Sequence, residues 1–204
     1  AFVGHLFLSE CQREDFGSDP HSDVLTTQVT SKIGNWHQHD PGTNRSSDPF
    51  WYGDDLINMV LNANQDHEVG CHTFSHIPLD ESQVTSEIAH SQLSKCQELA
   101  GLKGLELRSM VFPRNIVGHL PLLASLGFDC YRGPEHSWYT GLAGKTRRIA
   151  HFTHRLLGLP PPVYKKLDVQ SGIVNIPASM FLMPSDGVRT IIPARSRIRQ
   201  AMYG

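Results

Sequence analysis

Apolar residues along this chain fall into short runs separated by segments in which they recur at helical spacing. Apolar runs typical of buried strands occupy residues 2–8, 68–72, 109–113, 128–131 and 173–176. Helical spacing is clearest at residues 51–61, 80–101, 120–126 and 150–157. This alternation, repeated about five times, predicts a parallel α/β fold with right-handed crossovers rather than an α+β fold.

The predicted strands are not followed by glycine-rich phosphate loops of the GxGxxG or GKS/T type. Their absence favours an incomplete (β/α) barrel over a doubly wound nucleotide-binding fold. In such barrels the functional residues follow the carboxyl ends of the strands. Polar segments occupy this position at 72–76, 113–115 and 131–133. We therefore expect these three loops to share one face of the molecule.

Residues 11–50 have no hydrophobic period and are rich in Ser, Asp, Gly, Pro and His. A loop of this length in a compact domain is usually a functional cover or a mobile insertion. We predict a poorly packed loop insertion near the mouth of the site. Its contribution would be an aromatic platform for a sugar, through Trp36 or through Trp51 just beyond it.

Composition narrows the function further. The 204 residues suit one domain, and no apolar run approaches the ~18–20 residues of a membrane span. Lys and Arg number 18 against 20 Asp and Glu, with no basic stripe, which argues against a nucleic-acid partner. The four cysteines form no CxxC pair, so no zinc ribbon or disulfide framework is indicated, and a cytoplasmic location is slightly favoured. Twelve histidines direct attention to histidine chemistry.

The strongest local signal is a pair of histidines four residues apart. His72 and His76 stand at the end of a predicted strand and the start of a helical turn. Side chains at this spacing can point at one cation, and imidazole is a ligand that suits zinc. Thr73 and Ser75 lie between them and could hold the loop and orient the ligands. The alternative is two surface histidines with no ligand.

Four segments resemble the polysaccharide deacetylase family, which includes chitin and peptidoglycan deacetylases. HTFSH at 72–76 resembles the family's H-[ST]-x-x-H metal motif, and HEVG at 67–70 resembles the strand that leads into it. VFPRN at 111–115 and LGFDCYRG at 126–133 resemble the third and fourth blocks. The resemblance spans roughly residues 51–133 and is strongest in the first block.

This resemblance implies a distorted (β/α) barrel and an enzyme of carbohydrate metabolism. A divalent metal, usually zinc, would be held by His72, His76 and one aspartate. A second aspartate would act as base and a late histidine as general acid. Metal-bound water would then attack the N-acetyl carbonyl of an amino-sugar polysaccharide or oligosaccharide.

Substrate-binding candidates come from the later blocks. Arg114 and Asn115 follow the predicted strand at 109–113. Tyr131 and Arg132 could contact sugar hydroxyls or anionic groups, with packing at a strand end as the alternative.

The chain also departs from the family pattern. Residues 1–10 contain no Asp-Asp pair, and the Leu-x-x-His strand with the late histidine is missing. Asp54-Asp55 stands at a predicted helix start, where acidic residues favour the helix dipole. The arginine of the third block follows its proline at Pro113 instead of preceding it. We expect residues 1–204 to be one catalytic domain truncated at both ends and inactive alone, with its base and acid outside the fragment.

Other residues and functions rank lower. His37, His39 and Asp40 could bind a metal in their loop, although a solvated loop is the favoured interpretation. His151 and His154 are predicted on a helix surface or end, and Cys71 as a small core residue rather than a nucleophile. Rival functions are a catalytically inactive sugar-binding barrel, or a related hydrolase of another non-peptide C–N bond or an O-acetyl ester.

Overall fold

The computed structural model describes residues 1–11, 19–26, 36–134, 137–160, 164, 167–178, 191, 193–196 and 198. The chain divides into two compact units. Unit 1 consists of Ala1–Arg132 and Asp168–Asn175, and unit 2 of Gly133–Leu167 and Ile176–Gly204. The single catalytic domain over 1–204 stays a prediction.

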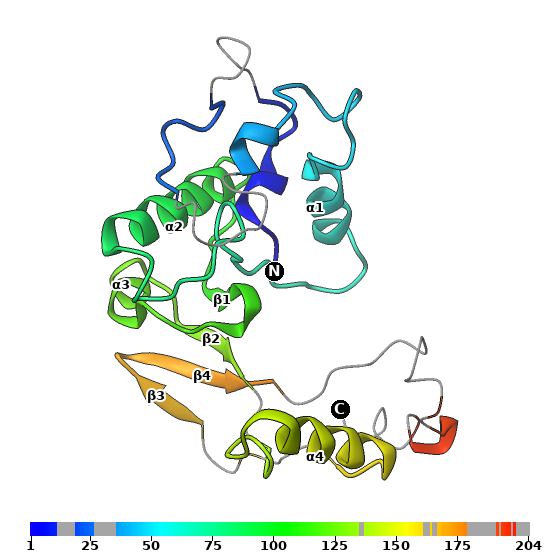
Figure 1. The fold of residues 1–204 in the computed structure, drawn as a ribbon. Helices are drawn as coiled ribbons and strands as arrows, with labels where there is room; N and C mark the ends of the chain where they lie inside the picture. Colours follow the sequence, from blue (N-terminus) through cyan, green and yellow to red (C-terminus); the bar gives the residue numbers. More distant parts are fainter. Residues whose placement is uncertain are drawn as a thin grey trace. The chain divides into compact units, whose positions relative to one another are not determined.

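The sheet has four strands in the order β1-β2-β4-β3 (Figure 1). They are β1 (Ser109–Val111), β2 (Cys130–Gly133), β3 (Asp168–Gln170) and β4 (Ile173–Pro177). β1 and β2 are parallel, with Met110 opposite Tyr131, whereas β3 pairs antiparallel with β4 as an edge hairpin. The fold is therefore α/β with a mostly parallel sheet that is not closed.

Two isolated bridges extend the parallel pairing beyond β1. Cys71 pairs with Met110 on one side and with Phe2 on the other, both in parallel. The first three predicted strand runs are therefore neighbours in the predicted orientation. β1, β2 and β4 confirm three of the strand predictions, and Cys71 marks the fourth as a single bridge.

The predicted strand over residues 2–8 is wrong. Only Phe2 pairs as a strand residue, and Gly4–Phe7 form a 3-10 helix, η1. The reason is local: the Leu6 amide turns back to the Val3 carbonyl, at 3.0 Å, instead of continuing the ladder. This turn buries Gly4, His5 and Phe7, so the apolar run reflects burial rather than an extended strand.

The helices of unit 1 follow the predicted positions with shifted ends. They are α1 (Asp54–Leu61), α2 (Ser86–Gly101) and α3 (Leu120–Ser125). α2 begins six residues later than Asp80, because the Thr85 hydroxyl accepts the Ile88 amide as the N-cap, at 3.4 Å. Asp80 instead accepts the amide and hydroxyl of Ser82 in a turn. Both α1 and α2 pack against η1, and Figure 1 shows η1 between them.

Unit 2 contains α4 (Gly144–Leu156), which begins earlier than the helix predicted around 150–157. His154 was expected on the helix surface but is buried, and its Nδ1 accepts the indole N–H of Trp138, at 3.1 Å. Among the described residues, no helix is long and apolar enough to cross a membrane. None of the four cysteines, all of which are described, forms a disulfide.

The close packing of η1 generates the first prediction. A Cβ on Gly4 would lie 2.6 Å from Cys96 Sγ and 3.0 Å from Phe74 Cα, whereas one on Gly101 would meet nothing within 4 Å. We expect Gly4→Ala to lower the free energy of unfolding by about 1–3 kcal/mol. Gly101→Ala, the matched control in α2, should leave it unchanged or raise it by up to about 1 kcal/mol. Urea unfolding measures both, and equal stability of the two variants would contradict this packing.

Candidate functional site

The predicted histidine pair lies in a loop that leaves the parallel sheet beside β1. The Nδ1–H of His72 donates to the Val111 carbonyl oxygen, at 2.5 Å. This bond fixes the tautomer, because a carbonyl only accepts, and it leaves Nε2 of the neutral ring as the lone-pair nitrogen. The imidazole centroids of His72 and His76 are 4.7 Å apart. The structure therefore brings the two predicted ligands together, with one of them oriented as a metal ligand would be.

The loop is anchored by its own polar residues, as the sequence predicted for Thr73 and Ser75. The amide and hydroxyl of Ser75 both donate to Gln92 Oε1, at 2.9 and 2.8 Å, in the interior below α2. The Thr73 hydroxyl donates to the Ile77 carbonyl, at 3.4 Å. These bonds hold left-handed backbone at Thr73 and His76, where φ is 58° and 57°. Such conformations cost energy for residues other than glycine and concentrate at functional sites.

Both imidazoles are held in the form that binds metal. Burial lowers the pKa of His72 below its usual range. Burial also lowers the pKa of His76, and repulsion from Arg114, and from His72 whenever that ring is protonated, adds to the effect. A neutral imidazole offers a nitrogen lone pair, so this part of the loop needs no deprotonation before a metal binds near neutral pH.

The substrate-binding candidates divide into exposed and buried side chains. Arg114 and Asn115 lie in η4 (Pro113–Asn115) directly after β1, and both are exposed with φ of 56°. Arg132 is exposed in β2. Because Cys71 and β1 pair in parallel, the segments after them, which carry His72–His76 and Arg114–Asn115, leave the same edge of the sheet. The predicted loop at 131–133 is wrong, because Tyr131 and Arg132 pair with Met110 and Val111 and strand β2 continues to Gly133. Tyr131 is only 2% exposed and packs edge-on against Phe112, at 5.6 Å between centroids, so its burial speaks against a sugar contact.

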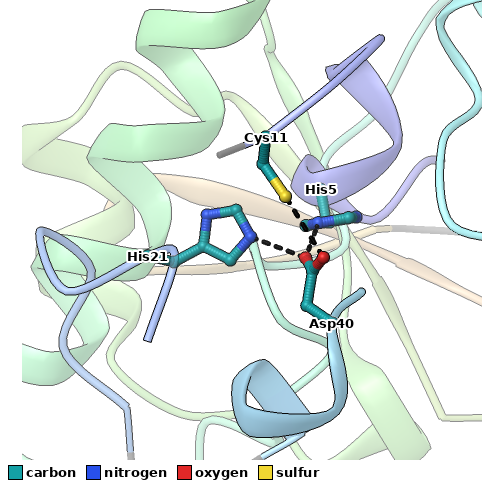
Figure 2. Close-up of side chains that lie close together, drawn as sticks. All are labelled: His5, Cys11, His21 and Asp40. Carbon is teal, nitrogen blue, oxygen red and sulfur yellow. Dashed lines mark hydrogen bonds and ion pairs between the residues drawn. The ribbon is translucent and has the colours of Figure 1, made fainter. Parts of the chain in front are cut away.

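A second group of ligand-type side chains lies in unit 1, and the sequence did not predict it. His5, Cys11, His21 and Asp40 each offer one ligand atom, and these atoms all lie within 4.8 Å of one another. Asp40 Oδ2 lies 2.6 Å from His5 Nε2 and 2.9 Å from His21 Nε2, and Asp40 Oδ1 accepts the Cys11 thiol at 3.1 Å. Figure 2 shows the other three side chains directed at the Asp40 carboxylate. This cluster could hold a metal ion.

Asp40 is the centre of this cluster and is ionised. Burial by itself would raise the pKa of its carboxyl, but hydrogen bonds from His21 and His5 hold it well below its usual range. The Gly42 amide, which donates to Oδ1 at 2.8 Å, lowers the pKa further, as does Cys11. The carboxylate is therefore a fixed negative charge in an interior position, 1% exposed.

The described part of the 11–50 segment is better packed than predicted. His21, Val24, His37 and Asp40 are all buried, so the expected poorly packed loop is wrong for these residues. His37, His39 and Asp40 were candidates in a loop expected to be solvated; of these three, His37 and Asp40 are buried and His39 is exposed. The Trp36 side chain, one of the two proposed platforms, lies outside the described residues. Trp51, the other, lies beside His5, with ring centroids 6.1 Å apart.

Sequence reasoning missed His5, Cys11 and His21 because nothing in their spacing marks them as ligands. His5 lies in η1, Cys11 lies next to the bridge residue Glu10, and His21 lies in a turn, so no helical or strand spacing relates the three. The available signal was the density of histidine, cysteine and aspartate in a segment without apolar period.

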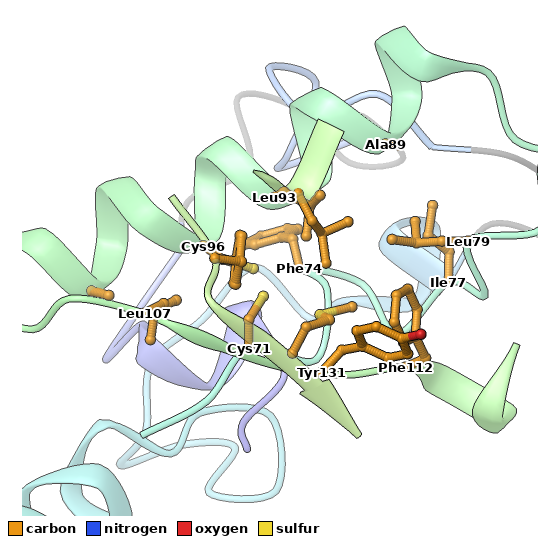
Figure 3. Packing of buried hydrophobic residues seen from close by; sticks show 14 of the residues in the cluster. Cys71, Phe74, Ile77, Leu79, Ala89, Leu93, Cys96, Leu107, Phe112 and Tyr131 are labelled. Atoms are coloured by element: carbon orange, nitrogen blue, oxygen red, sulfur yellow. The ribbon is translucent and has the colours of Figure 1, made fainter. Parts of the chain in front are cut away.

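Phe74 connects the two histidine groups. Its ring centroid lies 5.9 Å from that of His5, 5.2 Å from that of His21 and 5.8 Å from that of His37. In Figure 3 the same ring packs beside Leu93 and Cys96 of α2. The loop that carries His72 and His76 thus also supplies the apolar floor of the buried cluster.

Comparisons with known proteins gave no match: no family model, no curated protein and no solved structure is similar to this chain.

The buried loop histidine generates a pH prediction. Burial lowers the pKa of His37 to about 4. Below pH 6.5 His37 is protonated in the unfolded chain but stays neutral in the folded protein. Its contribution to the free energy of unfolding is therefore fully present above pH 6.5 and is lost as the pH falls toward 4. Between pH 7 and 4.5 we expect His37 to account for a loss of about 2–3 kcal/mol in the free energy of unfolding. Denaturant unfolding of His37→Gln should show a shallower pH dependence than the wild type.

His39→Gln is the matched control, because His39 is exposed in the same loop. It should keep the wild-type pH dependence. Identical slopes for the two variants would mean that His37 takes up its proton in the folded protein.

Proposed function

We propose that this chain belongs to a metal-dependent hydrolase that removes N-acetyl groups from an amino-sugar polysaccharide or oligosaccharide. The proposal places the chain on an incomplete barrel of the polysaccharide deacetylase type. It assigns the metal to His72 and His76, with Zn²⁺ as the preferred ion. The parallel pairing of Phe2, Cys71, β1 and β2 supports the barrel part of this proposal.

The observation that carries the proposal is the arrangement of the two imidazoles. They stand together at a strand end, one has its Nδ1–H donated to a backbone carbonyl, and burial keeps both neutral. Metal-binding histidines characteristically make such a bond with their second nitrogen. Two neutral imidazoles with one carboxylate leave a coordination position for water, which is the catalytic form of a zinc site.

The described residues supply two of the three expected ligands. Within the part of the chain that the structure describes, no group of three His, Cys, Asp or Glu ligand atoms includes His72 and His76. The aspartates that the resemblance implies would complete this ligand set. When bound, the metal would supply a water of lowered pKa and polarise the acyl carbonyl.

The chain's own residues would position the substrate. Arg114 and Asn115 are exposed after β1, and Arg132 is exposed in the neighbouring parallel strand β2, where it pairs with Val111, the carbonyl partner of His72. Their donors can bind sugar hydroxyls or an anionic substituent beside the metal. Arg114 also places a positive charge near His76, which disfavours protonation of that ligand.

A catalytically inactive sugar-binding barrel is the second candidate. The incomplete ligand set among the described residues favours it. A hydrolase acting on another non-peptide C–N bond or on an O-acetyl ester would use the same pair of histidines and differs only in substrate.

The test uses the full-length protein and measures acetate released from N-acetylglucosamine oligomers. His72→Ala and His76→Ala should each reduce release by at least about 100-fold, because each removes a metal ligand. His67→Ala is the matched control, since His67 precedes the same loop but is exposed, and it should retain activity. Circular dichroism checks that all variants fold.

Two outcomes would contradict this proposal. Chelator-sensitive acetate release that survives in His72→Ala would place the metal elsewhere. Oligomer binding by the wild type without release of acetate would favour the inactive sugar-binding barrel.

A further inference from the structure

We propose that His5, Cys11, His21 and Asp40 form a second metal site, a structural zinc site that is independent of the proposed function. The four ligand atoms converge within 4.8 Å of one another. They share no residue with the His72 and His76 pair.

The donor set selects the metal. Two imidazole nitrogens, a thiol sulfur and a carboxylate oxygen are the ligand types of tetrahedral zinc sites. A thiolate and imidazoles disfavour Mg²⁺ and Ca²⁺, which prefer oxygen ligands throughout. The charges also match, because Zn²⁺ with one thiolate and one carboxylate gives a neutral group. Neutrality matters here, since His5, His21 and Asp40 are all buried.

The contacts of His5 leave one ring nitrogen for Asp40 and for a metal ion that would replace the shared proton. His5 Nδ1 lies 2.9 Å from the Trp51 carbonyl oxygen, which only accepts, so Nδ1 carries the hydrogen. Nε2 faces Asp40 Oδ2, 2.6 Å away, which is the distance of a hydrogen bond. A zinc ion at about 2.0–2.2 Å from each atom would replace the shared proton and move the two atoms to about 3.3 Å apart. His21 Nε2 approaches the same oxygen, which places a second nitrogen donor around the same point.

The residues around the cluster hold its ligands in place, as the surroundings of metal sites do. The Trp51 carbonyl orients His5, and the Gly42 amide binds the second oxygen of Asp40. The buried Tyr52 hydroxyl lies 3.1 Å from Cys11 Sγ and accepts the Thr43 amide, at 3.0 Å. Since that amide donates to Tyr52, the phenol hydrogen is free to point at sulfur and would stabilise a thiolate.

The site is closed rather than catalytic. Four protein ligands fill a tetrahedral zinc ion and leave no position for water or substrate. His5 lies in η1, and Cys11 follows Glu10, which forms a bridge with Asn44. His21 lies in a turn, and Asp40 directly follows η3 (Trp36–His39). These stretches contain little regular structure, so one ion would cross-link parts of the chain that few ladder hydrogen bonds connect. On binding, the Cys11 thiol and the imidazole–carboxylate contacts release their protons to solvent.

Cobalt substitution tests this site separately from the proposed active site. The purified chain is stripped with a chelator and titrated with Co²⁺, which reports a bound thiolate through a charge-transfer band in the near ultraviolet. The wild type should show the band, and zinc should displace it and raise the melting temperature. Cys11→Ser should lose both effects, whereas Cys130→Ser, the control at a partly exposed cysteine, should keep them.

Two further variants separate structural loss from loss of a ligand. Tyr52→Phe keeps all four ligands but removes the hydroxyl next to sulfur, so it should weaken zinc binding by about 10–100-fold with the band retained. The double variant His72→Ala/His76→Ala should keep the band and the thermal shift. That result stands whether or not the protein is a deacetylase.

The proposal would be overturned if the wild type, folded by circular dichroism, gave no thiolate band with Co²⁺. It would also be overturned if the band survived in Cys11→Ser or disappeared in the His72→Ala/His76→Ala variant.

Discussion

The arrangement of unit 1 depends on one short backbone pairing between the start of the chain and the histidine loop. The amides of Gly4 and His5 donate to the carbonyls of Thr73 and Phe74, at 2.8 and 3.1 Å. This pairing sets the position of the His5 ring on the N-terminal segment and of the Phe74 ring on the histidine loop. It requires glycine at position 4, because a side chain there would collide with Cys96 Sγ and the Phe74 backbone. The same two backbone hydrogen bonds therefore position both the His5 group and the loop that carries His72 and His76.

Asp40 fixes the arrangement of the described residues of segment 11–50, which has no apolar period. A buried carboxylate is costly unless donors surround it, and here His5, His21 and the Gly42 amide all face it. A fully satisfied polar centre of this kind specifies one arrangement more sharply than apolar contacts do. This explains why the described residues of the segment are buried although their sequence shows no amphipathic pattern. Loss of any one donor leaves the buried Asp40 carboxylate less well compensated, so we expect each donor to be needed for this arrangement.

The sequence predicted those features that repeat and missed those that depend on a single contact. β1, β2 and β4, and the positions of α1 and α3, follow from apolar periodicity. The His72 and His76 pair was found because both residues lie on one loop at a strand end. η1 was missed, since a buried 3-10 turn and a buried strand present the same apolar run. In α1 the predicted apolar face is only partly used, with Ile57 buried and Leu56 51% exposed.

The buried cluster could not be predicted for a different reason. Its members are brought together by tertiary contacts among stretches of irregular backbone, and no local spacing encodes that meeting. Tyr131 and His154 were also misjudged, because side chains of this kind, with an apolar body and a polar tip, are common at surfaces but are buried here. Residue type alone does not distinguish a ring that faces solvent from one that fills the core.

The two histidine groups obey one local rule and differ in what surrounds them. In each, an imidazole gives its Nδ1–H to a backbone carbonyl, Val111 for His72 and Trp51 for His5, so that Nε2 is the nitrogen left for a cation. At the sheet edge the described residues supply two nitrogens, with the exposed Arg114 near His76, which suits the proposed ion that would also bind water and substrate. In the interior a carboxylate and a thiol complete the set, which suits an ion that only holds the chain together. The two proposed roles therefore differ in the number of ligands and in their burial. Phe74 links the two groups, because its ring packs against His5 and His21 while its loop carries His72 and His76.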